Sequence, residues 1–216
     1  LAKNPKENIN ASQRERAWMF QKTAAKRAKM FEAADGKTFT FGDTELVFSP
    51  AVAHGSDDHS LGWVTMVTVE CDEERFMFAS DVQGPMSLYT TELILNAKPD
   101  VLMMGGPPLY LEGGRVSERQ IKQALLNLTR IVEAVPLVIL EHHALRDASW
   151  RSKLSSVFQK AEATDHSIVT AAEFCGEANN LLEAKRKELF RDFPVSAEFQ
   201  AWTKTLTGKT ITKPPL

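Results

Sequence analysis

The chain has 216 residues, of which 43% are hydrophobic and 25% are charged, and its formal net charge is −2. This length suffices for one domain with a buried core, and the composition is typical of a globular protein. The small net charge excludes a global positive field that would attract nucleic acid or anionic lipid. No uninterrupted apolar stretch approaches the ~18 residues that a membrane span needs. We therefore expect a soluble, cytoplasmic protein with no membrane partner.

Residues 14–31 contain good helix formers and few helix breakers, and residues 10–13 offer an N-cap side chain, so we predict a first helix there. Basic residues recur along it at helical spacing among apolar ones. This pattern indicates a solvated helix face, with phosphate binding as the alternative.

Four strands are predicted in the next part of the chain. Alternating apolar residues at 37–41 and 44–49, on either side of a Gly-Asp turn, predict a β-hairpin. Residues 62–69 and 75–80 have the same character and are separated by a charged turn, so we expect them to be antiparallel neighbours.

From residue 87 onward, helices and strands alternate in the sequence. A helix at 87–97 leads to a buried strand at 101–104, and an amphipathic helix at 117–134 leads to a strand that begins after Pro136. We predict one domain over residues 1–216, of α/β class, in which helices flank mixed β-sheets. Residues 148–216 are expected to form a helical C-terminal extension of that domain, with helices at 150–163, 171–193 and 196–206 and a loose tail at 213–216.

Metal-binding side chains follow three of the apolar runs directly. His54 ends one run, Asp81 another, and His142 and His143 a third, so three of the five histidines lie at predicted strand ends. Imidazole and carboxylate groups are the ligands that zinc and related divalent ions accept. For Asp81 the alternative is a turn or helix cap. Of the adjacent histidines, His142 is slightly favoured as a ligand, because strand alternation would point His143 to the opposite side.

Two further sets of residues are candidates for the same site. Gly105 and Gly106 follow the strand at 101–104 in a sequence that is neither a dinucleotide fingerprint nor a P-loop. Together with Tyr110 they are candidates for lining a substrate pocket, and a purely structural turn is the alternative. Asp147 is a candidate carboxylate that accepts a hydrogen bond from an imidazole of the site and so orients it, with Arg146 as its alternative partner.

The order of His54, Asp81 and His142-His143 resembles the later metal-binding motifs of the metallo-β-lactamase superfamily. Longer stretches resemble a mostly archaeal branch of predicted metal-dependent hydrolases within it: KENIN at 6–10, FASDVQGP at 78–85, GGPP at 105–108 and HHALRD at 142–147. The resemblance covers most of residues 1–147. It implies a metallo-β-lactamase-like αββα sandwich.

The resemblance also implies a mechanism. Asp81 would bridge two divalent ions, expected to be zinc with manganese or iron possible, while His54 binds one ion and His142 or His143 the other. Asp81 and His54 would then be the central catalytic ligands. A hydroxide held by the metal would attack a small ester, lactone, thioester or phosphoester.

One motif of the superfamily, a His-x-His-x-Asp-His loop, does not occur in this sequence. In the family it would precede Leu1, so we expect N-terminal strands and part of the metal site to be missing from this chain. The alternative is a protein that lacks the loop altogether.

Three functions remain open. The first is a metal-dependent hydrolase acting on a small molecule. The second is a nuclease or phosphodiesterase of the same fold, which the acidic charge balance disfavours. The third is a non-catalytic binding or scaffold protein without metal. The sequence does not indicate an oligomeric state.

Overall fold

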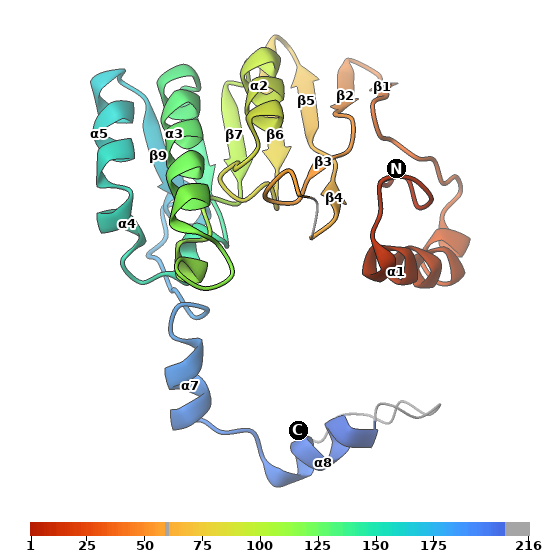
Figure 1. The fold of residues 1–216 in the computed structure, drawn as a ribbon. Coiled ribbons are helices and arrows are strands. Elements are labelled where there is room, and N and C mark those ends of the chain that lie inside the picture. Colours follow the sequence, from red (N-terminus) through yellow and green to blue (C-terminus); the bar gives the residue numbers. More distant parts are fainter. Residues whose placement is uncertain (59–60, 206–216) are drawn as a thin grey trace. The chain divides into compact units, whose positions relative to one another are not determined.

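The structure is a computed structural model, and it describes residues 1–58 and 61–205. The chain divides into two compact units, Leu1–Asn179 and Asn180–Leu216, which we describe separately. In the first unit, a seven-stranded mixed sheet has the strand order β1-β2-β5-β6-β7-β8-β9, and helices flank it (Figure 1). The predicted α/β class is therefore confirmed.

The first half of this sheet is antiparallel. β1 (Thr38–Phe41) and β2 (Thr44–Phe48) form the predicted hairpin, and β5 (Val67–Cys71) pairs with both β2 and β6 (Glu74–Ala79).

The predicted strand at 62–69 is divided in two. Its first part, β4 (Trp63–Val64), leaves the large sheet and pairs with β3 (Val52–Ala53) in a separate two-stranded sheet. The division occurs at Met66, where the Ser49 hydroxyl accepts the backbone N–H of Met66.

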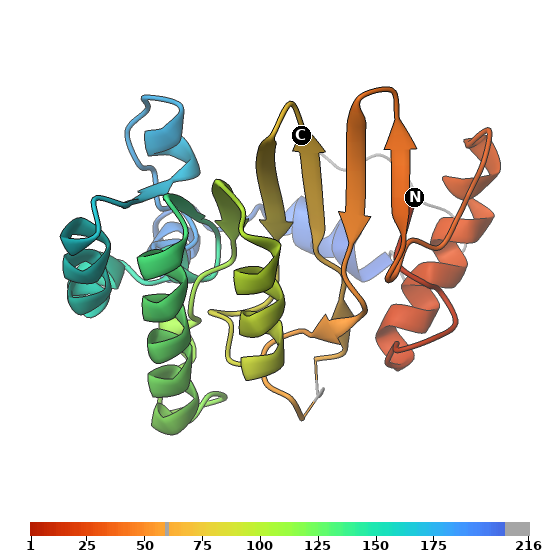
Figure 2. The same ribbon diagram turned by 90° about the horizontal axis from the view of Figure 1, so that it is seen from above.

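The second half of the sheet is parallel and is built from successive strand–helix–strand units. β6 is followed by α2 (Leu88–Ala97), β7 (Val101–Met104), α3 (Glu118–Ala134) and β8 (Leu137–Leu140). Each parallel strand lies one position further along the sheet. Crossovers of one handedness that advance in one direction place their helices on the same face. Figure 2 shows α2 and α3 together on one side of the sheet.

The core lies between these helices and the sheet. Ile94 of α2 and Leu128 and Ile131 of α3 are fully buried, as are Leu102 and Met104 of β7. The start of α3 is fixed by a capping box, in which the Ser117 and Gln120 side chains each accept a hydrogen bond from the other's backbone N–H. The predicted helix at 117–134 is thus confirmed to within one residue.

The opposite face of the sheet is also apolar but is only partly covered. Phe76 and Phe78 alternate on β6 with the buried Met77 and Ala79, and each phenylalanine is 37% exposed. An αββα sandwich contains two large sheets. Within residues 1–58 and 61–205, one large sheet is present, with β3 and β4 beside it as a small second sheet.

Several predicted helices differ from those observed. The helix predicted at 14–31 is α1 (Ala11–Lys22), followed by the 3-10 turn η1 (Ala25–Arg27). It ends at Thr23, whose hydroxyl donates to the carbonyl of Met19 and so competes with helix continuation.

The predicted helical extension from residue 148 is not helical throughout. It contains α4 (Trp150–Lys153), α5 (Ser155–Ala163) and the short α6 (Ala171–Phe174), and also β9 (Ser167–Thr170), a strand that the sequence did not predict. β9 pairs in parallel with β8 and therefore belongs to the large sheet. The helix predicted at 171–193 is interrupted because Gly176 adopts a left-handed φ of 75°.

The second unit contains α7 (Arg186–Asp192) and α8 (Ala197–Thr205). The tail expected to be loose, residues 213–216, lies outside the described residues. Among the described residues, no helix combines the length and the apolarity that crossing a bilayer requires.

Two leucines on α3 test where the core lies. Leu128 is fully buried, whereas Leu126 on the same helix is 54% exposed. We expect Leu128→Ala to lower the free energy of unfolding by about 2–5 kcal/mol, because it removes buried methyl groups and leaves a cavity. Leu126→Ala should cost less than about 1 kcal/mol. Equal losses in urea unfolding would contradict this assignment of the core.

Candidate metal centre

The predicted metal ligands meet at one edge of the sheet because three adjacent strands run in parallel. Ala79 of β6, Met104 of β7 and Leu140 of β8 lie level with one another in the register. The residues that follow each strand therefore emerge at the same edge. Asp81 follows β6, Gly105 and Gly106 follow β7, and His142 and His143 follow β8.

Asp81 lies at the centre of this group. Its Oδ1 atom is 3.1 Å from Nε2 of His142, 3.1 Å from Nε2 of His143 and 3.7 Å from Nε2 of His54. His54 reaches the group from the small sheet, where it directly follows β3 and donates its backbone N–H to the carbonyl of Gly62. The structure thus brings together all four predicted ligands.

The expectation that strand alternation separates the two adjacent imidazoles is wrong. β8 ends at Leu140, and the backbone of His143 is already helical (φ −68°, ψ −49°) at the start of the 3-10 turn η3 (Ala144–Arg146). The two rings are consequently neighbours, with centroids 4.1 Å apart. His54, Asp81 and His143 each offer a ligand atom within 4.8 Å of the others, so His143 is as well placed as His142.

Left-handed backbone conformations accompany this cluster. Asp81 has a φ of 63° and Gln83 a φ of 54°, values that non-glycine residues adopt at a cost of order 1–3 kcal/mol. At Gly55 the φ is 94°, and a Cβ there would lie 2.7 Å from Oε1 of Gln83. Glycine is therefore favoured after His54, because the chain turns there with a positive φ and packs against Gln83.

The protonation states of the cluster suit metal binding. A hydrogen bond from His143 lowers the pKa of Asp81 to about 2, against the opposing effect of burial and with help from the charges of His54 and His142. Desolvation by burial lowers the pKa of His54. An ionised carboxylate and a neutral imidazole are the forms that coordinate divalent ions.

A buried nitrogen gives a second indication that the site fits a cation. Nε2 of His54 is shielded from solvent and has no hydrogen-bond partner among the described residues. It faces Asp81 at a separation too long for a hydrogen bond. Buried polar atoms are rarely left without a partner, and a metal ion would supply one.

The glycines after β7 allow the strand ends to approach closely. A Cβ on Gly105 would lie 3.0 Å from Cδ2 of His143, and one on Gly106 would lie 2.8 Å from Cβ of Ala144. Both glycines are buried, and they pack closely beside the cluster.

A cavity of about 390 Å³ opens beside the cluster. His54 and His143 line it at one side, and Tyr110, from the 3-10 turn η2 (Leu109–Leu111), lines it as well. This volume lies within the ~300–1,000 Å³ range of small-molecule sites.

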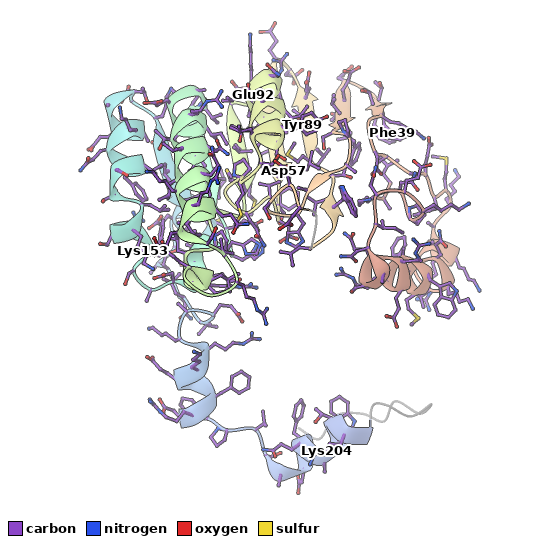
Figure 3. All side chains as sticks on the ribbon, in the orientation of Figure 1. Phe39, Asp57, Tyr89, Glu92, Lys153 and Lys204 are labelled. Carbon is purple, nitrogen blue, oxygen red and sulfur yellow. The ribbon has the colours of Figure 1, made fainter. Side chains whose placement is uncertain are left out.

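The prediction that Asp147 orients an imidazole does not agree with its contacts. The Asp147 carboxylate accepts hydrogen bonds from Nζ of Lys153 (2.7 Å), the last residue of α4 (Figure 3), and from the backbone N–H of Ser149 (2.8 Å). These bonds stabilise the turn into α4.

The carboxylate beside an imidazole is instead that of Glu141, which was not among the residues predicted from the sequence. Its Oε2 lies 3.4 Å from Nδ1 of His142, and its Oε1 accepts a hydrogen bond of 2.5 Å from the Ser80 hydroxyl. The sequence feature that could have identified Glu141 is its position directly after an apolar strand. His59, the histidine closest to His54 in the sequence, lies outside the described residues.

Comparison with known proteins gives several archaeal relatives, each named "UPF0282 protein". The chain is 39% identical over 203 residues to that of Korarchaeum cryptofilum, 44% over 190 residues to that of Thermococcus sibiricus and 42% over 190 residues to that of Methanocaldococcus jannaschii. These alignments include 94%, 88% and 88% of this chain, which spans 67%, 60% and 61% of the respective relatives.

No protein-family model matches the chain. Among solved structures, a mutant of the CmlA beta-hydroxylase aligns with a TM-score of 0.42 and 16% identity, over 63% of this chain and 31% of that one.

The cluster predicts metal binding that depends on Asp81. We expect the purified chain to retain about one zinc ion or more after dialysis, and Asp81→Ala to lose at least one. His166→Gln is the matched control, because His166 precedes β9 at the other end of the strands and bonds to the carbonyl of Val132. Elemental analysis measures the ion content. A wild-type chain that holds no ion after zinc loading would exclude the site.

The close packing at Gly106 predicts a steric effect. We expect Gly106→Ala to lower the free energy of unfolding by about 1–3 kcal/mol, because the new methyl group would overlap with Ala144. Gly114→Ala is the control, since a Cβ there meets its nearest neighbour at 3.6 Å, and its effect should stay within about 0.5 kcal/mol. Urea unfolding of both variants checks this, and similar effects would contradict the tight contact.

Proposed function

This chain belongs to the UPF0282 family of archaeal proteins, and we propose that it is a metal-dependent hydrolase acting on a small molecule. The observation that carries the proposal is the Asp81 carboxylate, which lies within 3.1–3.7 Å of three imidazoles. Two of these imidazoles, His54 and His143, also line the adjacent cavity. A ligand in that cavity would therefore touch the metal ligands directly.

His54, Asp81 and His143 would hold the ion, with His142 as the neighbouring ligand. We propose zinc, and manganese or iron as alternatives, because mixed imidazole and carboxylate ligation suits all three. In its more specific form, the proposal is that Asp81 and the three histidines would hold two divalent ions. A divalent ion bound there supplies Lewis-acid polarisation of a substrate oxygen and activation of water near neutral pH.

The residues of the chain itself would position the reaction. Asp81 stays ionised because of the hydrogen bond from His143, and it keeps the imidazoles oriented toward one point. Glu141 lies beside Nδ1 of His142 and would hold that ring with its Nε2 toward Asp81. Ser80 in turn donates to Glu141 and keeps its carboxylate in place.

The cavity volume of about 390 Å³ favours a small ester, lactone, thioester or phosphoester as the substrate. The net charge of −2 gives no general attraction for nucleic acid, so we place nuclease or phosphodiesterase action second. A cytoplasmic location remains part of the proposal.

Metal-dependent turnover tests this function. The zinc-loaded chain should hydrolyse members of a panel of nitrophenyl esters, thioesters and phosphoesters and a lactone, and chelation should abolish the activity. Zinc, manganese or iron added back should restore it. His54→Ala should lower kcat/KM by about a hundredfold or more, because it removes one ligand, whereas His166→Gln should leave kcat/KM unchanged.

Two results would overturn the proposal. Activity that survives chelation would show that the metal cluster is not the reacting centre. A chain that holds its metal yet hydrolyses no member of the panel would favour the non-catalytic binding role.

A further inference from the structure

The cavity beside the cluster carries positive charge on its walls. Arg115 and Arg146 both line it, and Asp58 is the one acidic residue among its described lining residues. Arg115 belongs to the loop that leads into α3, whereas Arg146 ends η3, three residues after His143. The two guanidinium groups thus come from segments that follow different strands, yet they border the same space.

Arg146 is held in position by an aromatic neighbour. Its Nη1 donates a hydrogen bond of 2.8 Å to the hydroxyl of Tyr110, and its guanidinium carbon lies 5.5 Å from the centroid of that ring. The contact joins η2, after β7, to η3, after β8. A guanidinium whose orientation is fixed loses less freedom when it binds a planar or tetrahedral anion.

The remaining walls divide the cavity into polar and apolar parts. Met86, Leu111 and Val116 contribute apolar surface, and His54 and His143 give access to the metal cluster. Val116 directly precedes Ser117, the N-cap of α3, so the positive end of this helix dipole lies near the cavity wall.

We propose that this cavity receives an anionic group of the substrate, a carboxylate or a phosphoryl group, on Arg146 with support from Arg115. The substrate class would then be small organic anions that present their reacting bond toward His54 and His143. This inference rests on the proposed function in one respect, namely that the bound anion is a substrate. The anion site itself is formed by Arg146 and Arg115, so its binding can be measured without metal and without turnover.

Binding to the chelator-treated chain tests the anion site separately from hydrolysis. Calorimetric titration with inorganic phosphate and, in parallel, with glutarate distinguishes the two anion types. We expect at least one of them to bind the wild-type chain, and added chloride salt to weaken the binding. Phosphate alone would identify a phosphoryl group, and glutarate alone a carboxylate.

Matched variants identify the residues responsible. Arg146→Gln should weaken binding about tenfold or more, because charge-assisted hydrogen bonds to the anion are lost. Tyr110→Phe retains the ring and the guanidinium charge but removes the hydroxyl acceptor, so a smaller loss of about two- to fivefold is expected. The control is Arg130→Gln, which removes a surface ion pair with Glu92 of α2 and should leave anion binding unchanged.

The outcomes separate this inference from the proposed function. If the wild-type chain binds neither anion, or if Arg146→Gln binds as tightly as Arg130→Gln, the anion site is wrong even where metal-dependent hydrolysis is found. If anion binding depends on Arg146 while the metal-loaded chain hydrolyses nothing, the anion site stands and the hydrolase proposal fails.

Discussion

The parallel pairing of β6, β7 and β8 is the constraint on which the candidate site depends. Because Ala79, Met104 and Leu140 are level in the sheet, the residues after them reach one edge together. A shift of one residue in this register would turn the apolar set of a strand to its other face, so burial of the helix-covered face keeps the register fixed. The packing of α2 and α3 on the sheet therefore determines where Asp81, His142 and His143 lie.

The residues at this edge of the sheet adopt conformations that lower stability but that bring the candidate metal ligands together. Asp81 and Gln83 have left-handed backbones, an ionised carboxylate is half-buried among imidazoles, and Nε2 of His54 lacks a hydrogen bond among the described residues. Such features are unfavourable in a purely structural turn and persist where the surrounding fold holds them in place. The close contacts of Gly105 and Gly106 supply that support, because they bring the segment after β7 against His143 and Ala144.

Much of this arrangement could be predicted from the sequence, because the apolar runs at 75–80, 101–104 and 137–140 are regular and each ends on a distinctive residue. The sequence did not reveal β9, since four residues beside a polar stretch give a weak strand signal and its pairing with β8 is a tertiary contact. Asp147 was selected by its distance along the chain, but Lys153 is its partner in space. Glu141 was missed for the same reason: its neighbours, Ser80 and His142, are brought to it by the fold.

The charges at this edge connect the proposed metal and anion sites. Asp81 is ionised, and an anion that enters from the arginine side would meet its negative charge near His54 and His143. A divalent ion bound to Asp81 would reverse the sign of the field at that point. Coupling between two binding sites is reciprocal, so each ligand would strengthen the binding of the other. His142, His143 and Arg146 all belong to the segment that follows β8, and the register that gathers the imidazoles therefore also sets Arg146 beside them.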